Sequence, residues 1–267
     1  MVASIRLPNG PDAVRQALES GGVLIAGGTH LMAELNNRAS ADTHLISLRR
    51  AGLAGISVDA GVATMGATTT LASVACDERL AFLSGCVRSI ASPPVRNLAT
   101  IAGNLFVPQP YGDLAAALLA LAAEVDIASP DGERTEPVEN VLTAGIPASS
   151  FVARVRFRVP GTNEFRFHKA SRRRINAPAV VTVAAHLKLS DGVVSDVRIA
   201  LGGVAPTPVR SVGAECALLG GPVDRTSIAR AAEAALADIA PFDDAHASAW
   251  YRTRVVPVHL RRALLGG

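Results

Sequence analysis

Apolar positions in the first part of the chain switch between helical and strand-like spacing. The stretch from Pro11 to Ser20 has helical spacing, and the short apolar run at 23–25 ends on two glycines, as a buried strand does. Thr68 to Thr70 stand where an N-cap is expected before an apolar helix. We therefore expect helices over 11–20, after Thr29 and over 71–76, and strands over 23–25, 45–48 and 62–67. This alternation is typical of an α+β fold.

Longer apolar runs in the second part flank two clear turns. Ser190-Asp191-Gly192 separates two such runs and predicts a β-hairpin. Pro160-Gly161-Thr162-Asn163 is the clearest break in the chain, so we expect two packed α+β domains, at residues 1–160 and 161–267. Within them the pattern predicts helices over 113–123, 228–239 and 243–265. We expect the last helix to be capped by Asp243, kinked at Pro257 and stopped by Gly266. Strands are predicted over 124–128, 151–159, 180–189 and 193–201, with a turn at 129–132.

Composition narrows the class of protein. Of 267 residues, 49% are hydrophobic and 18% are charged, which excludes disorder driven by charge. The longest apolar stretch, at 114–123, is shorter than the roughly 18 residues of a spanning helix. The N-terminus carries no apolar signal-peptide core after a basic start. We expect a globular cytoplasmic protein without a membrane span.

Several kinds of chemistry are disfavoured. The three cysteines form no CxxC pair, so this chain is not expected to hold a disulfide framework, an iron–sulfur cluster or a zinc site. The arginine clusters lack interleaved aromatics, so nucleic acid is not an expected partner. Phosphate-loop, dinucleotide-fold, zincin and nucleophile-elbow motifs are absent. His30 and Glu34 share a helical spacing but lack a third ligand, so we predict no metal site and no catalytic residue.

Two glycine-containing segments are the candidates for ligand binding. In the first, Leu24-Ile25-Ala26-Gly27-Gly28-Thr29-His30-Leu31, a strand passes through two glycines into a helix, and such a turn exposes amides that can hold a phosphate. The second, Thr100-Ile101-Ala102-Gly103-Asn104, places small residues between two hydrogen-bonding side chains. Two such loops suit a pyrophosphate bridged from both sides, although a Gly-Gly between strand and helix is also an ordinary turn.

A carboxylate follows the second loop at Asp113. It could accept hydrogen bonds from sugar or ribityl hydroxyls, or it could act as the N-cap of the helix that follows.

Six motifs, in this order and spacing, resemble one known family. They are AGGTHL at 26–31, ATIAGNL at 99–105, PYGDLAAALLAL at 110–121, HKASRRRINAPAVVTVAA at 168–185, ALGGVAPTPVR at 200–210 and WYRTRVVPVHLRRAL at 250–264. They resemble the FAD-binding medium subunit of the molybdenum hydroxylases, the group of xanthine dehydrogenase and carbon monoxide dehydrogenase. Each motif is loose alone, but six in register cover nearly the whole chain.

The resemblance implies a fold and a role. Residues 1–160 would form a FAD-binding domain of the p-cresol methylhydroxylase (PCMH) type, built of two α+β subdomains, and 161–267 a C-terminal α+β domain like that of the carbon monoxide dehydrogenase flavoprotein. FAD would relay electrons from the [2Fe–2S] clusters of a small partner subunit to an external acceptor. A large molybdopterin subunit would oxidise the substrate, in a heterotrimer that dimerises.

The resemblance also implies site residues. The family's first FAD loop falls on residues 24–31 and its second on 100–104, and the amides of both would hold the pyrophosphate. Asp113 matches an acidic residue that contacts the cofactor, and Lys169 matches a lysine near the flavin, unless it is a surface lysine. Ile90 matches an apolar contact less securely.

Three positions depart from the family pattern. His30 stands where Asp, Ser or Glu is frequent, Ala102 replaces the first glycine of a TxGGN motif, and Asn176 replaces a frequent Asp. Ala102 is tolerable if its φ is negative, and costs about 1 kcal/mol or more if it is not.

Two alternatives remain open. The chain could be a flavin-binding structural or assembly subunit without redox turnover. It could also be a self-sufficient FAD oxidoreductase, which the absence of a recognisable acid–base pair disfavours.

Overall fold

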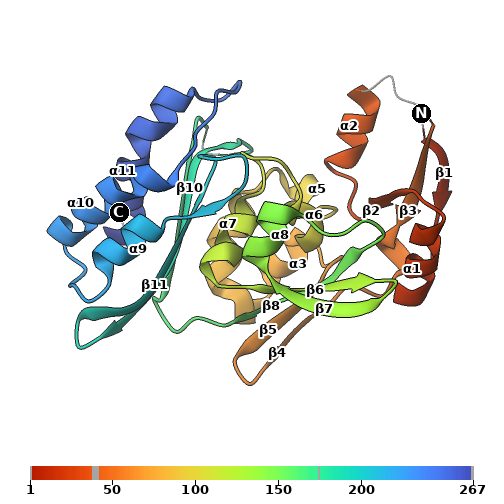
Figure 1. Ribbon diagram of the computed structural model, residues 1–267, viewed down its shortest axis with the longest axis horizontal. Coiled ribbons are helices and arrows are strands. Elements are labelled where there is room, and N and C mark those ends of the chain that lie inside the picture. The colour runs from red at the N-terminus through yellow and green to blue at the C-terminus, as the bar shows by residue number, and fades with distance from the viewer. Residues whose placement is uncertain (1, 38–41, 174, 266–267) are drawn as a thin grey trace.

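Three β-sheets lie side by side along the molecule in the computed structural model, which describes residues 2–37, 42–173 and 175–265. Figure 1 shows the N-terminal sheet at one end, a larger sheet in the middle and the C-terminal sheet at the other end. Within the described ranges, no helix combines the length and the apolar character needed to cross a membrane.

The N-terminal sheet is parallel, with strand order β1-β3-β2. Its elements are β1 (Val2–Arg6), α1 (Pro11–Glu19), β2 (Val23–Ile25), α2 (Leu31–Asn37), β3 (Thr43–Ser47) and η1 (Leu48–Arg50). Pro11 starts α1, where the first-turn N–H that proline lacks has no helical partner anyway, and Val14 and Leu18 are the buried residues of this helix. The predicted helix, strand, helix order is confirmed here.

The central sheet is antiparallel, in the order β4-β5-β8-β6-β7. Its elements are β4 (Ile56–Asp59), β5 (Val62–Gly66), α3 (Leu71–Cys76), η2 (Glu78–Leu83), α4 (Ser84–Ser89), α5 (Pro93–Arg96), α6 (Ile101–Leu105), α7 (Asp113–Ala120), β6 (Glu124–Ser129), β7 (Gly132–Pro137), α8 (Val138–Ala144) and β8 (Phe151–Arg158). Thr70 caps α3 as predicted, because its Oγ1 accepts a hydrogen bond from the Ser73 amide at 3.1 Å.

The C-terminal sheet is also antiparallel, in the order β12-β11-β10-β9. Its elements are β9 (Phe165–Ser171), β10 (Ala179–Ser190), β11 (Val193–Gly202), β12 (Val209–Arg210), α9 (Val212–Leu218), α10 (Arg225–Ala234), η3 (Ala235–Asp238) and α11 (Ala249–Leu265). The predicted hairpin of β10 and β11 is confirmed, and both Asp191 and Gly192 in its turn have positive φ. The predicted boundary between 160 and 161 lies in the connection from β8 to β9.

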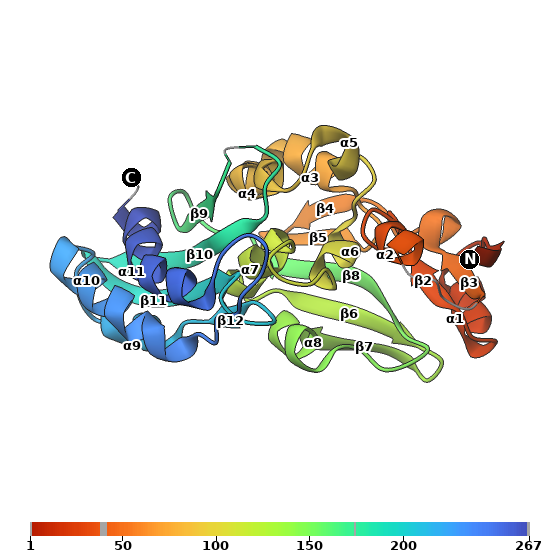
Figure 2. The ribbon, with the colours of Figure 1, turned by 90° about the horizontal axis from the view of Figure 1, so that it is seen from above.

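Helix α7 joins the central and C-terminal sheets. All eight of its residues are buried, and it packs against one face of β10 and β11 while α9 and α11 cover the other face (Figure 2). The side chains on the two faces of this sheet differ in size. Ala184 and Ala200, which pair across the two strands, belong to the core around α7, whereas the larger Val183 and Ile199 belong to the core under the C-terminal helices. Small side chains thus let α7 lie close to the sheet.

Several predicted boundaries are wrong. The last helix begins at Ala249 rather than Asp243, because the carboxylate of Asp244 accepts hydrogen bonds from the amides of His246 and Ala247 and holds that segment in a loop. Asp243 still accepts from the Ala249 amide at 2.5 Å, α11 continues through Pro257, and Gly266 lies outside the described residues. The helix predicted over 228–239 starts earlier, at the capping box of Asp224, and is divided into α10 and η3. The helix predicted over 113–123 ends at Ala120. After the turn at 129–132, β7 and α8 occupy a span for which no element was predicted.

Candidate functional site

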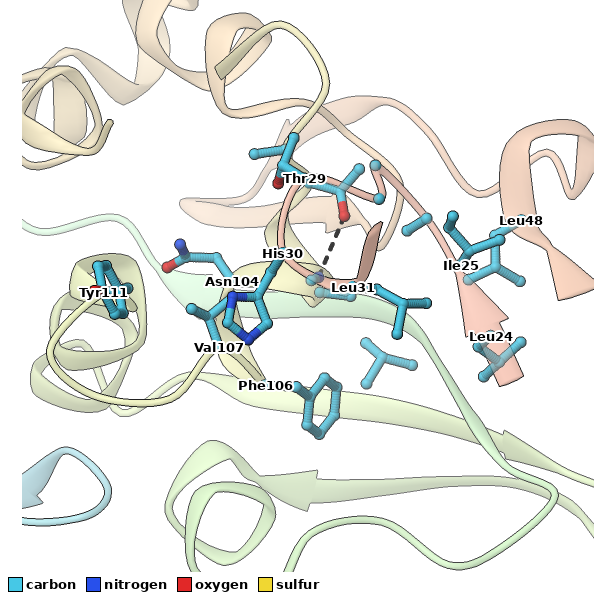
Figure 3. Close-up of a pocket in the computed structure, with 18 of the residues that line it drawn as sticks. Leu24, Ile25, Thr29, His30, Leu31, Leu48, Asn104, Phe106, Val107 and Tyr111 are labelled. Atoms are coloured by element: carbon cyan, nitrogen blue, oxygen red, sulfur yellow. Dashed lines mark hydrogen bonds between the residues drawn. The ribbon is translucent and has the colours of Figure 1, made fainter. Parts of the chain in front are cut away.

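A cavity of about 600 Å³ lies between the β2–α2 loop and α6. This volume is within the range of about 300–1,000 Å³ that small-molecule and cofactor sites have. Figure 3 shows Leu24, Ile25 and Leu48 at one end of the cavity and Tyr111 at the other. All of residues 24–31 and four of the five predicted second-loop residues, Thr100, Ala102, Gly103 and Asn104, line it.

The first loop has the backbone conformation that its two glycines allow. Gly28 has φ +71°, a region that residues with a Cβ rarely adopt. A Cβ on Gly27 would lie 1.9 Å from the carbonyl oxygen of Leu98, so only glycine lets this loop pack against the chain that leads into the second loop. The two glycines therefore serve different purposes, one for the turn and one for close packing.

The amides of the first loop are free to bind a ligand. Within the part of the chain that the structure describes, the N–H groups of Gly27, Gly28, Thr29 and His30 donate to no protein atom, although the carbonyls of Gly28 and His30 accept from Met32 and Glu34. Consecutive unpaired amides at a cavity wall form a site for an anionic oxygen.

The second loop differs, because its amides are already used. Ile101 N donates to Thr69 O, Ala102 N to Ala67 O, Gly103 N to Thr100 Oγ1 and Asn104 N to Thr100 O, at 3.0–3.2 Å. The expectation that these amides face a phosphate is therefore wrong: Thr100 is the N-cap of α6, and the chain before α3 accepts the remaining donors. What the loop presents to the cavity is its side chains and its close-packed surface.

Asn104 and Ala102 show how this loop is built. Asn104 Oδ1 accepts from the Leu114 amide at 3.1 Å, which ties α6 to α7, and its Nδ2 donates to no described residue. Ala102 is helical and is absent from the described residues with positive φ, so this departure from the family pattern carries no backbone strain.

Asp113 and Lys169 meet in a buried ion pair. Lys169 Nζ lies 2.7 Å from Asp113 Oδ2 and 3.0 Å from the carbonyl oxygen of Ser89, and Thr182 Oγ1 donates to Asp113 Oδ1. Both side chains are buried, so the alternative of a surface lysine is wrong. The alternative of a helix cap is wrong as well, because Gly112 is the N-cap of α7 and the Asp113 carboxylate faces Lys169 instead.

Electrostatics around this pair follow from burial. Burial raises the pKa of Asp113, and the neighbouring Lys169 ammonium and Thr182 hydroxyl oppose that rise. Burial also raises the pKa of the Cys86 thiol well above its usual value, and the Asp113 charge adds to this. Cys86 is thus an inert core residue.

Asp113, Lys169 and Ile101 do not line the cavity. The pair nevertheless stands next to it, because Ser89 precedes Ile90 and Ala91, which are cavity residues. The less secure prediction of Ile90 as an apolar wall residue agrees with its place in the lining.

Sequence reasoning missed most of the other walls. These include Phe106, Val107 and Tyr111 between α6 and α7, Ile146 after α8, and Phe151 and Val152 on β8. Aromatic residues make up only 4% of the chain, so two of them within eight residues after the second loop, Phe106 and Tyr111, were a usable signal in the sequence.

His30 and Glu34 lie together at the cavity, with Nε2 of His30 3.7 Å from Oε1 of Glu34. His30 precedes α2 rather than lying within it. The structure holds no group of three potential metal ligands among its described residues.

Two protein-family models match the chain. One, described as the FAD binding domain in molybdopterin dehydrogenase, matches residues 11–157, and the other, the CO dehydrogenase flavoprotein C-terminal domain, matches residues 166–266.

Named relatives and solved structures agree with these models. The carbon monoxide dehydrogenase medium chain of Hydrogenophaga pseudoflava is 31% identical over 258 residues, which cover 92% of this chain and 89% of the relative. The xanthine dehydrogenase FAD-binding subunit of Escherichia coli O157:H7 is 27% identical over 256 residues, covering 90% and 87%. A chain of a solved structure of the Hydrogenophaga pseudoflava carbon monoxide dehydrogenase superposes with a TM-score of 0.93 at 28% identity, covering 99% of this chain and 96% of that chain. Quinoline 2-oxidoreductase from Pseudomonas putida 86 superposes with a TM-score of 0.91 at 28% identity, covering 98% and 95%.

These matches confirm the resemblance drawn from the six motifs, the fold class and FAD as the cofactor. The chain belongs to the family of FAD-binding medium subunits of the molybdenum hydroxylases, which are oxidoreductases.

Proposed function

We propose that the cavity between the β2–α2 loop and α6 is where this chain binds FAD. The observation that carries the proposal is the row of unpaired amides at Gly27, Gly28, Thr29 and His30 on the wall of a largely apolar cavity of about 600 Å³. These amides would hold the diphosphate. Asn104 would offer its amide group, and apolar walls such as Phe151 would exclude water.

Asp113 and Lys169 stay in this proposal as a buried ion pair next to the cofactor cavity, not as part of its lining. Because their charges face each other at 2.7 Å, a bound ring would meet a dipole rather than a free cation. Any effect of Lys169 on the electronic properties of the site is accordingly smaller than that of an isolated ammonium group.

The proposed role is electron relay. Bound FAD supplies the chemistry that accepts electrons singly and releases them in pairs. We propose that the electrons come from [2Fe–2S] clusters of a small partner subunit, after substrate oxidation at the molybdopterin of a large subunit, and that an external acceptor receives them. The relatives named as medium chains support a heterotrimer, which we expect to dimerise. We place the complex in the cytoplasm and keep residues 1–160 and 161–267 as the two domains.

Release of the chromophore tests the cofactor site. The purified chain, reconstituted with excess flavin and then heated, should release FAD and not FMN, since FMN lacks the diphosphate that the first loop would hold. Metal analysis of the isolated chain should find neither stoichiometric iron nor molybdenum. Release of FMN, or no flavin retained after reconstitution with FAD, would contradict the proposed site.

Reconstitution with partner subunits tests the role. If the chain relays electrons, its FAD should be reduced when substrate is added to the assembled complex, and not when substrate is added to the isolated chain. FAD that stays oxidised in an assembled complex turning over substrate would instead favour the structural or assembly subunit.

A further inference from the structure

The cavity holds few charges for a site that would take a doubly negative diphosphate. Among the described residues that line it, none is lysine or arginine, and the side chains that titrate are His30, Glu34 and Tyr111. Of these described side chains, only that of His30 can become a cation. A diphosphate taken out of water into apolar surroundings requires compensating charge or hydrogen bonds.

His30 is placed to provide that charge. Its backbone belongs to the loop with the unpaired amides, and Figure 3 shows its ring pointing into the cavity near Asn104 and Val107. Nε2 is buried and has no hydrogen-bond partner among the described residues, and Oε1 of Glu34 lies 3.7 Å away. Nδ1 makes no hydrogen bond to any described residue and is the ring atom left for a ligand.

On the basis of the proposed FAD site, we propose that His30 is a specificity-determining contact for the diphosphate and that it binds in its protonated form. In that form the Nε2–H points to the Glu34 carboxylate and the Nδ1–H donates to a phosphate oxygen, a charge-assisted hydrogen bond. The imidazolium would stand between the Glu34 carboxylate and the phosphate and shield the two negative charges from each other. Loss of the proton removes both this hydrogen bond and the positive charge beside the diphosphate.

Other groups around the ring do not duplicate this role. Tyr111, between α6 and α7, has its hydroxyl 3.1 Å from Nε2 of His246, so that pair is already engaged. The lining residues from α6 and β8 are Ala102, Gly103, Asn104, Phe151 and Val152, which do not titrate. Glu34 is the charged neighbour on α2.

The protonated form of His30 that this inference requires determines how the affinity for FAD depends on pH. Imidazoles take up a proton as the pH falls through the neutral range, whereas the diphosphate stays ionised there. FAD affinity is therefore greatest at low pH and declines as the pH rises. We expect the Kd for FAD to increase about tenfold between about pH 6 and pH 8, the size of one charge-assisted hydrogen bond.

Titration of the full-length apoprotein with FAD, followed by flavin fluorescence at both pH values, tests this. His30→Gln keeps a polar side chain of similar size without the charge, and it should bind FAD at both pH values about as weakly as the unmodified protein does near pH 8. His30→Lys has a permanent charge and should bind equally well at both. Riboflavin, which has no phosphate, should show no pH dependence with any of the three proteins.

The outcomes separate this inference from the proposed site. If His30→Gln retains the pH dependence of the unmodified protein while FAD still binds, the role of His30 is wrong and the site stands. If the unmodified protein binds FAD at neither pH, the site itself is wrong. A pH dependence that riboflavin shares would assign the effect to a group away from the diphosphate and would also overturn the inference.

Discussion

The two glycine-containing loops at the cavity look alike in sequence but use their backbones in opposite ways. In the first, four consecutive amides, those of residues 27–30, have no partner among the described residues. In the second, the amides of residues 101–104 all donate within the protein. Glycine and threonine in a loop therefore do not show whether its amides are available. That depends on whether carbonyls from another segment lie within reach.

The second loop has such carbonyls because it pairs with the chain before α3. Thr70 and Thr100 form an isolated antiparallel bridge, and Leu71 N donates to Ala99 O at 2.8 Å. The first loop follows β2, where the chain leaves the sheet, and none of the described strands pairs with it. The first loop is thus the polar side of the cavity and the second is a rigid wall.

Removal of the Lys169 charge, in the ion pair that lies next to the cavity, should have the largest effect. Lys169→Met leaves Asp113 buried without its cation, and breaking such a pair should lower the free energy of unfolding by about 4 kcal/mol. Chemical denaturation checks this. The loss should be smaller near pH 5 than near pH 8, because the buried carboxyl of the variant can take up a proton and become neutral.

Lys188 is the matched control, since it is the only other lysine in the chain. Its Nζ is 3.9 Å from Asp196 and its side chain is exposed, so Lys188→Met should change the free energy of unfolding by less than about 0.5 kcal/mol. Equal effects of the two substitutions would show that the buried Lys169 pair stabilises the fold no more than an exposed lysine does.

The contact between the two loops is the next test. Gly27→Ala places a methyl group against the backbone oxygen of Leu98, which cannot be relieved by a rotamer change. We expect the Kd for FAD to rise roughly 100-fold, about 3 kcal/mol, as the first loop moves away. Gly85→Ala, where a Cβ meets nothing within 4 Å, should leave FAD binding unchanged. Circular dichroism distinguishes a displaced loop from an unfolded protein.

Alanine at one glycine of each loop compares the loops directly. Gly28→Ala forces a Cβ into φ +71° and should weaken FAD binding about tenfold. Gly103→Ala lies in a helix with negative φ, where only Thr100 Oγ1 at 3.0 Å must adjust, and should alter the Kd less than about threefold. Calorimetric titration with FAD measures both, and a larger effect at Gly103 would reverse the assigned roles of the loops.

The smallest effect is expected at the cap of α6. Thr100→Val keeps the shape of the side chain but leaves the Gly103 amide without its acceptor, so the melting temperature should fall by an amount equivalent to about 1 kcal/mol. Binding of FAD should change less than about threefold, because this amide is not offered to the ligand. A large loss of affinity with unchanged stability would show that the Thr100 hydroxyl contacts the cofactor.

Local pattern predicted the elements that follow their own propensities. Pro11 and the cap at Thr70 located helices, and the turn at Asp191-Gly192 located the hairpin. The start of α11 was missed because Asp244 satisfies the amides of His246 and Ala247 and competes with the helix. Strand β7 has largely exposed polar residues, so it gives no apolar alternation to read.

The sequence predicted only the part of the cavity that comes from continuous segments. The first loop is continuous in sequence, and its two glycines indicate a turn without reference to distant residues. The apolar walls come from segments around residues 90, 106, 111, 146 and 151, which only pairing of the central sheet and packing of its helices bring together. The partnership of Asp113 with Lys169 spans 56 positions and joins α7 to β9, so no local pattern could show that the two charges compensate each other.

The alanines of β10 and β11 that face α7 have a consequence for how the chain can be divided. Ala184 and Ala200 belong to the core of the N-terminal half, and Thr182 bonds to Asp113, so the boundary at 160 separates sequence families but cuts through one packed interior. A polypeptide ending near residue 160 would expose to water the face of α7 that packs against β10 and β11. Separating the two parts at this boundary would therefore expose apolar surface that the intact chain buries.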